Sequence, residues 1–83
     1  MIPRIADIQA LDSFILQVRF DDGRLVHYDL KEDIATIPVF RSLQSEQGLY
    51  QNFQLDSSRT CVTWNEDIDL PSDCLYEYGR RIL

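Results

Sequence analysis

The sequence predicts an α+β fold, in which an antiparallel sheet of about five strands has two short helices packed on it. Apolar and polar residues alternate along the first half of the chain, which is the pattern of strands with one buried face. A turn sequence, Asp21, Asp22 and Gly23, interrupts this alternation. Helical spacing of apolar residues begins only after Pro38 and Pro71, so strands and helices are expected to share one core.

Residues 4–10 are expected to form the first strand. Pro3 stands at its start, where the ladder needs no hydrogen-bond donor. Ile5 and Ile8 break the strict alternation, and this spacing is compatible with a bulge in the strand.

Residues 14–30 carry the clearest signal, two alternating segments that predict a β-hairpin. A two-residue turn would place His27 beside Val18 and bury polar groups, at a cost of roughly 1 to 3 kcal/mol for each group without a partner. A three-residue loop over residues 21–23 instead pairs Val18 with Val26. We therefore predict the three-residue loop, with its glycine in the left-handed conformation that only glycine adopts without strain.

Later segments predict two helices and two more strands. Residues 38–45 are expected to form a helix that begins at its proline. Residues 50–55 and 60–64 read as strands that extend the same sheet. Residues 71–82 read as a second helix, which can stop at Gly79 because glycine costs about 1 kcal/mol inside a helix. The expected buried side chains are Val39, Phe40 and Leu43 on the first helix and Leu75, Tyr78 and Ile82 on the second.

Composition bounds the class of protein. A chain of 83 residues with 45% hydrophobic content predicts one folded domain over residues 1–83. No apolar run approaches the roughly 20 residues needed to cross a bilayer, and no export signal is recognisable, so a soluble cytoplasmic protein is expected. Cys61 and Cys74 are then expected to be free packing residues. The net charge of −6 opposes direct binding of nucleic acid or an anionic membrane.

Short motifs along the chain carry a family resemblance. They are Phe20, Asp21, Asp22 and Gly23; Tyr28, Asp29 and Leu30; Phe40 and Leu43; Val62, Thr63, Trp64 and Asn65; and Asp69, Leu70, Asp73, Leu75 and Tyr76. Together they resemble the small bacterial domain of unknown function numbered twenty-four forty-two, over nearly the whole chain. The resemblance implies a protein that occurs alone, in gene pairs of the toxin and antitoxin type, or fused ahead of a helix-turn-helix domain. It implies no catalytic residues.

A cluster of acids after Trp64 is the first candidate for chemistry. Glu66, Asp67, Asp69 and Asp73 could supply the oxygen ligands that Ca²⁺ and Mg²⁺ prefer. Their spacing lacks the central glycine and terminal glutamate of a calcium loop. A structural role explains the cluster better: Asp69 or Ser72 caps the following helix, and water solvates the remaining acids.

Other reactive side chains stand alone. His27 is the only histidine, the residue type best suited to general base catalysis at neutral pH, but the predicted register gives it Arg19 and Gln17 as neighbours and no nucleophile. Neither cysteine has a histidine to activate it. Trp64 is followed by acids, so core packing explains it better than base stacking.

These observations favour a non-catalytic protein-interaction module, an antitoxin-like or regulatory partner that needs no cofactor. Its expected partner is a protein, either the product of a neighbouring gene or a second copy of the chain. Ile15, Leu25 and His27 on the outer sheet face form the candidate interaction surface. Two alternatives stay open: an accessory domain of a DNA-linked transcriptional regulator, and a metal- or metabolite-binding enzyme that uses Glu66, Asp67 and Asp69 of the acidic cluster.

Overall fold

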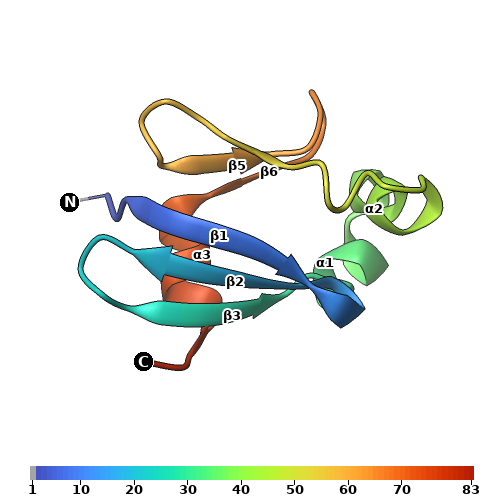
Figure 1. Ribbon diagram of the computed structural model, residues 1–83. Helices are drawn as coiled ribbons and strands as arrows, with labels where there is room; N and C mark the ends of the chain where they lie inside the picture. The colour runs from blue at the N-terminus through green and yellow to red at the C-terminus, as the bar shows by residue number, and fades with distance from the viewer. Residues whose placement is uncertain (1) are drawn as a thin grey trace.

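The computed structural model describes residues 2–83 and has the predicted α+β class, but its strands form two antiparallel sheets instead of one (Figure 1). The first sheet has the order β1-β2-β3-β7 and consists of β1 (Ile5–Leu11), β2 (Ile15–Phe20), β3 (Leu25–Asp29) and β7 (Arg80–Arg81). The second has the order β4-β5-β6 and consists of β4 (Gln54–Leu55), β5 (Cys61–Thr63) and β6 (Asp69–Pro71). The helices are α1 (Lys31–Thr36), α2 (Ser42–Ser45) and α3 (Ser72–Tyr78), with 3-10 turns at η1 (Asp12–Phe14) and η2 (Pro38–Arg41).

The central hairpin has the predicted register. Val18 pairs with Val26, and the Gly23 amide donates to the Phe20 carbonyl at 2.9 Å to close the three-residue loop. Gly23 has φ +93°, the left-handed conformation expected of it. Strand β1 pairs with β2 and its register shifts next to Ile5, so the bulge compatible with its spacing is present.

The turn between β1 and β2 holds two residues in a strained backbone conformation. Ser13 and Phe14 have φ of 64° and 59°, a region that residues other than glycine rarely adopt. Their carbonyls are both used, because Lys31 Nζ donates to Ser13 at 2.8 Å and the Leu30 amide donates to Phe14 at 2.9 Å. These bonds hold the turn in place and direct the ring of Phe14 onto Tyr50, with ring centroids 5.0 Å apart.

The middle of the chain differs from the prediction. The expected single helix over residues 38–45 is a 3-10 turn followed by the four-residue α2, and α1 before it was not predicted. Phe40 and Leu43 are buried as expected, but Val39 is 44% exposed because the tighter 3-10 turn rotates it away from the core. The strand expected over residues 50–55 is only two residues long.

The C-terminal helix does not run to Ile82 but stops at Gly79, as the sequence allowed. Its last helical residue is Tyr78, and Gly79 leads the chain directly into β7, which pairs with β3. Leu75 is fully buried, whereas Tyr78 is 76% exposed and Ile82 lies outside the helix, so the predicted inner stripe was wrong at those two positions. An extended tail no longer follows the helical period, and its side chains take new directions.

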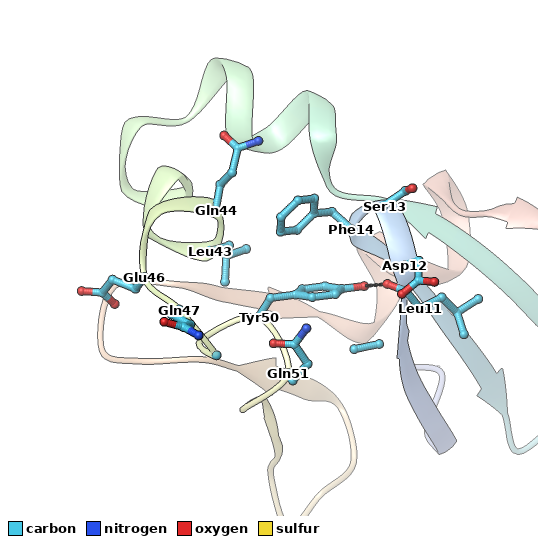
Figure 2. Close-up of a pocket in the computed structure, with 12 residues that line it drawn as sticks. Leu11, Asp12, Ser13, Phe14, Leu43, Gln44, Glu46, Gln47, Tyr50 and Gln51 are labelled. Carbon is cyan, nitrogen blue, oxygen red and sulfur yellow. Dashed lines mark hydrogen bonds between the residues drawn. The ribbon is translucent and has the colours of Figure 1, made fainter.

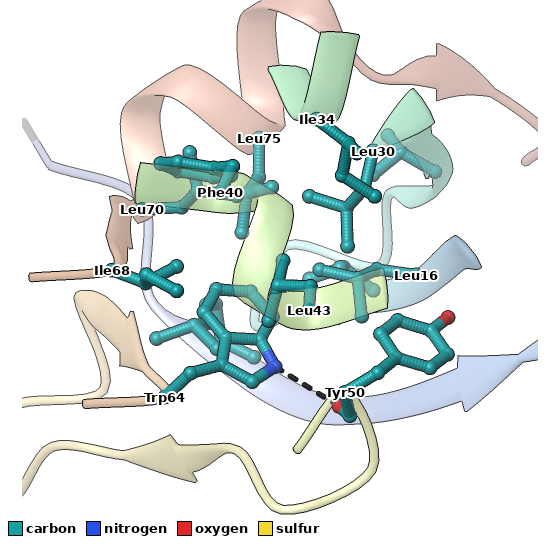
Figure 3. Close-up of a cluster of buried hydrophobic side chains, with 14 of the residues drawn as sticks. Leu16, Leu30, Ile34, Phe40, Leu43, Tyr50, Trp64, Ile68, Leu70 and Leu75 are labelled. Atoms are coloured by element: carbon teal, nitrogen blue, oxygen red, sulfur yellow. Dashed lines mark hydrogen bonds between the residues drawn. The ribbon is translucent and has the colours of Figure 1, made fainter. Parts of the chain in front are cut away.

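Both sheets contribute to one buried cluster (Figure 3). Trp64 is 7% exposed and its indole Nε1 donates to the Tyr50 carbonyl at 2.9 Å, which confirms it as a core residue. Around it lie side chains from every part of the fold, including Leu16, Leu30, Phe40, Leu43, Ile68, Leu70 and Leu75. Two small sheets and three short helices therefore share a single core, which stabilises elements too short to be stable alone.

Candidate interaction surface

One face of the four-stranded sheet has no helix on it. Helix α3 packs behind the sheet, and the face turned toward the viewer in Figure 1 is bare. Side chains on this outer face alternate with buried ones such as Leu16, Val18 and Val26. We define the outer face by the cross-strand rows Asp7, Arg19 and Leu25; Gln9, Gln17, His27 and Arg80; and Leu11, Ile15 and Asp29.

The middle row crosses all four strands. Gln9 pairs with Gln17, Gln17 with His27, and His27 with Arg80. His27 Nε2 lies 2.9 Å from Gln17 Oε1, and because an amide oxygen only accepts, this nitrogen carries the hydrogen. The row presents two amides, an imidazole and a guanidinium side by side, all able to form hydrogen bonds with a partner.

Apolar residues flank that row on both sides. Ile15 and Leu11 are half-buried neighbours at one end of the sheet. Leu25 lies on the other side and is only 9% exposed, because it pairs with Arg19 and the last residues of the chain run along its backbone. Its amide donates to the Leu83 carbonyl at 3.0 Å, and its carbonyl accepts from the Ile82 amide at 2.7 Å. Ile15, Leu25 and His27 thus share one face, although Leu25 contributes little accessible surface to it.

The acidic cluster does not assemble a metal centre. Glu66, Asp67, Asp69 and Asp73 are all exposed, and no group of three side chains within residues 2–83 is arranged to hold a metal ion. Asn65 organises the loop instead, because its Oδ1 accepts hydrogen bonds from the backbone amides of Asp67 and Ile68, at 2.8 and 2.9 Å. This amide acceptor, rather than the carboxylates, shapes the connection.

The predicted capping of α3 was wrong. Neither Asp69 nor Ser72 accepts from the free amides of the helix, whose N-cap residue is Pro71. Ser72 is fully buried, and its hydroxyl donates to the Pro3 carbonyl at 2.6 Å. The serine therefore ties the N-terminal segment to the start of α3, which no local sequence pattern could indicate because 69 residues separate the two positions.

A hollow of about 240 Å³ lies at the far end of the sheet, beside the strained turn (Figure 2). Phe14, Leu43 and Tyr50 supply its apolar part. The Tyr50 hydroxyl donates toward the carbonyls of Leu11 and Ile15, at 2.7 and 2.9 Å, and burial raises the pKa of Tyr50 to about 12. Its phenol is thus a neutral structural donor that closes the turn, not an acid for catalysis at neutral pH.

The two thiols are held in their protonated form. Cys61 and Cys74 are both free, and burial raises the pKa of each above its ordinary value. The negative charge of Asp69 raises the pKa of Cys61 further, and that of Asp33 does the same for Cys74, because each disfavours a thiolate. The Tyr28 hydroxyl beside Cys74 donates to Asp33 at 2.6 Å, and burial together with this bond raises the pKa of Tyr28. These groups therefore lack the properties of an activated nucleophile.

The fold and this surface define a class of protein, a small two-sheet α+β domain with one uncovered sheet face. Within residues 2–83, no helix is long and apolar enough to cross a membrane. The family model for DUF2442, described as a protein of unknown function, matches residues 5–81. The chain belongs to this family. No curated protein and no solved structure matches the chain.

Proposed function

We propose that this protein is a non-catalytic interaction module, an antitoxin-like or regulatory partner that binds another protein through the outer face. The observation that supports the proposal is the composition of that uncovered face. Half-buried Ile15 and Leu11 lie next to a row of amide, imidazole and guanidinium groups. The interfaces of non-obligate protein complexes combine apolar contacts with hydrogen-bonding groups in this way.

The distribution of charge favours a basic partner. Residues 42–79 carry seven acidic side chains and one basic side chain, Arg59, whereas the remainder of the chain has seven of each. Arg59 is already paired with Asp21 at 2.8 Å. The whole net charge of −6 therefore belongs to the part of the chain that forms the second sheet and α3. This field would raise the rate at which a basic protein first encounters the molecule, while the outer face itself carries two carboxylates and two guanidinium groups.

Co-purification of the full chain from its native host, followed by binding measurements with the identified partner, tests the proposal. Ile15→Glu places a charge on the outer face and is expected to weaken binding about tenfold or more. Val39→Glu is the matched control, because it adds the same charge at an exposed apolar residue on η2. Both variants are first checked for an unchanged melting temperature.

Equal affinity of a folded Ile15→Glu variant and the wild type for that partner would refute the outer face as the interface. Sedimentation of the purified chain alone distinguishes a second copy from a different protein. Association of the chain with itself that is lost in Ile15→Glu and kept in Val39→Glu would identify the partner as a second copy.

A further inference from the structure

A second surface, separate from the outer face, has the properties of a peptide-binding groove. It lies where the N-terminal segment, the β2–β3 turn and α3 meet, at the end of the molecule marked N in Figure 1. The hollow measures about 1080 Å³ and is the largest of the three hollows characterised in residues 2–83. We call it the terminal groove and define it by Ile2, Pro3, Arg4, Asp73, Tyr76 and Glu77.

The apolar part of the terminal groove is already in place. Tyr76 rests on the buried ring of Phe20, which it meets edge to face with ring centroids 4.9 Å apart and planes inclined by 80°. Ile2, which is 61% exposed, adds an accessible apolar side chain to the lining. Pro3 lies beside them and is held by the hydrogen bond from Ser72. Because Pro3 and Tyr76 are fixed by other contacts, a ligand would not have to order them, and preorganised surfaces bind at a lower entropic cost.

The carboxylates around the groove fall into two kinds. Asp21 is neutralised by Arg59, whose two guanidinium nitrogens lie 2.8 and 2.9 Å from its oxygens. Asp22 accepts from the Tyr76 hydroxyl and lies in the field of Arg24. Both carboxylates are therefore engaged in holding the fold.

Asp73 and Glu77 are different. They lie four positions apart on α3 and so share one side of the helix, and both are exposed. Neither forms an ion pair with any basic side chain of residues 2–83. Asp73 and Glu77 thus border an apolar surface whose lining has four carboxylates against one guanidinium, that of Arg4. This excess of negative charge makes the groove complementary to a ligand that is both apolar and positively charged.

We propose that the terminal groove binds a short peptide segment in which an apolar anchor is flanked by lysine or arginine. The anchor would lie against Ile2, Pro3 and the Tyr76 ring, and the basic residues would pair with Asp73 and Glu77. Nucleic acid does not fit, because its phosphates would meet these carboxylates. The inference stands apart from the outer face, so it holds whether or not that face is an interface.

Titration of the isotope-labelled full chain with a short amidated peptide, in which leucines alternate with pairs of lysine and arginine, tests this proposal by NMR. Amide shifts are expected at Arg4, Tyr76 and Glu77, with half-saturation at about 1 mM peptide or below. Added salt should weaken the binding, because the ion pairs are exposed. A peptide with glutamate in place of every basic residue should not bind.

Two double variants with the same change in charge show whether peptide binding depends on the carboxylates of the groove or only on the overall negative charge. Asp73→Asn with Glu77→Gln is expected to weaken peptide binding about fivefold, as two exposed ion pairs would. Glu66→Gln with Asp67→Asn removes the same charge in the loop before β6 and should leave the affinity unchanged. Equal loss in both double variants, or shifts centred on the loop or on His27, would overturn the proposal. So would the absence of shifts at about 1 mM peptide.

Discussion

The hydroxyl of Tyr76 donates a hydrogen bond to Asp22 at 2.5 Å, across 54 residues of sequence. The bond joins α3 to the turn of the central hairpin. Arg24 completes the junction, because its guanidinium carbon lies 3.9 Å above the Tyr76 ring and its Nη1 donates to the Tyr76 carbonyl at 3.3 Å. A turn that is local in sequence is thereby held by the last helix of the chain.

The first prediction concerns pH. The hydrogen bond from Tyr76 is the main reason that the pKa of Asp22 is lowered, followed by the bond from the Arg24 amide. A lowered folded-state pKa means that Asp22 stabilises the protein above about pH 4, and that this contribution is lost as the pH falls through the folded-state value. Tyr76→Phe should raise the pKa of Asp22 in an NMR titration and reduce the acid dependence of the melting temperature. An unchanged Asp22 pKa would show that the tyrosine does not control it.

The second prediction concerns Gly79, where α3 meets β3. A Cβ atom there would lie 2.5 Å from the Leu75 carbonyl oxygen and 2.9 Å from Cγ2 of Val26. Gly79→Ala should therefore destabilise the protein by about 1 to 3 kcal/mol in urea denaturation, because strand and helix must move apart. Tyr78→Ala, at an exposed neighbour, should change stability by about 0.5 kcal/mol or less. Equal effects of the two would contradict the close approach.

The third prediction concerns the strained turn. Ser13 has φ 64° and ψ 27°, a conformation that glycine adopts freely. Ser13→Gly should stabilise the protein by up to about 1 kcal/mol, since relief of strain exceeds the entropy that glycine adds to the unfolded chain. Ser57→Gly, at an exposed serine without a positive φ, should bring no gain. Thermal unfolding followed by circular dichroism measures both, and a loss of stability in Ser13→Gly would disprove the claim of strain.

The fourth prediction concerns Trp64. Phenylalanine at this position would leave the Tyr50 carbonyl without its indole donor and open a small cavity in the core. Trp64→Phe should cost about 2 to 4 kcal/mol of unfolding free energy. Because the variant removes the only tryptophan, unfolding is followed by circular dichroism rather than by indole fluorescence. A cost below about 1 kcal/mol would mean that the carbonyl finds another donor.

The candidate surface was only partly predictable. Alternation placed Ile15, Leu25 and His27 on one face correctly, because strand geometry sends successive side chains to opposite sides. Alternation could not show that Leu25 is nearly covered, since the covering segment, at residues 82–83, pairs with it only in the folded chain. The terminal groove was not predicted at all, because its parts come from the N-terminus, the hairpin and α3.

By itself the sequence determined the local features of this protein: the α+β class, the hairpin register, the left-handed Gly23 and the burial of Trp64. Each depends on residues close together in the chain or on one strongly apolar side chain. Only the tertiary structure decided that the strands divide into two sheets and that β6 and β7 exist. Strands of two or three residues have no period to read, and they form because a partner strand supplies their hydrogen bonds. The role of Ser72 was also decided by the tertiary structure. Its hydroxyl donates to the Pro3 carbonyl and does not cap α3.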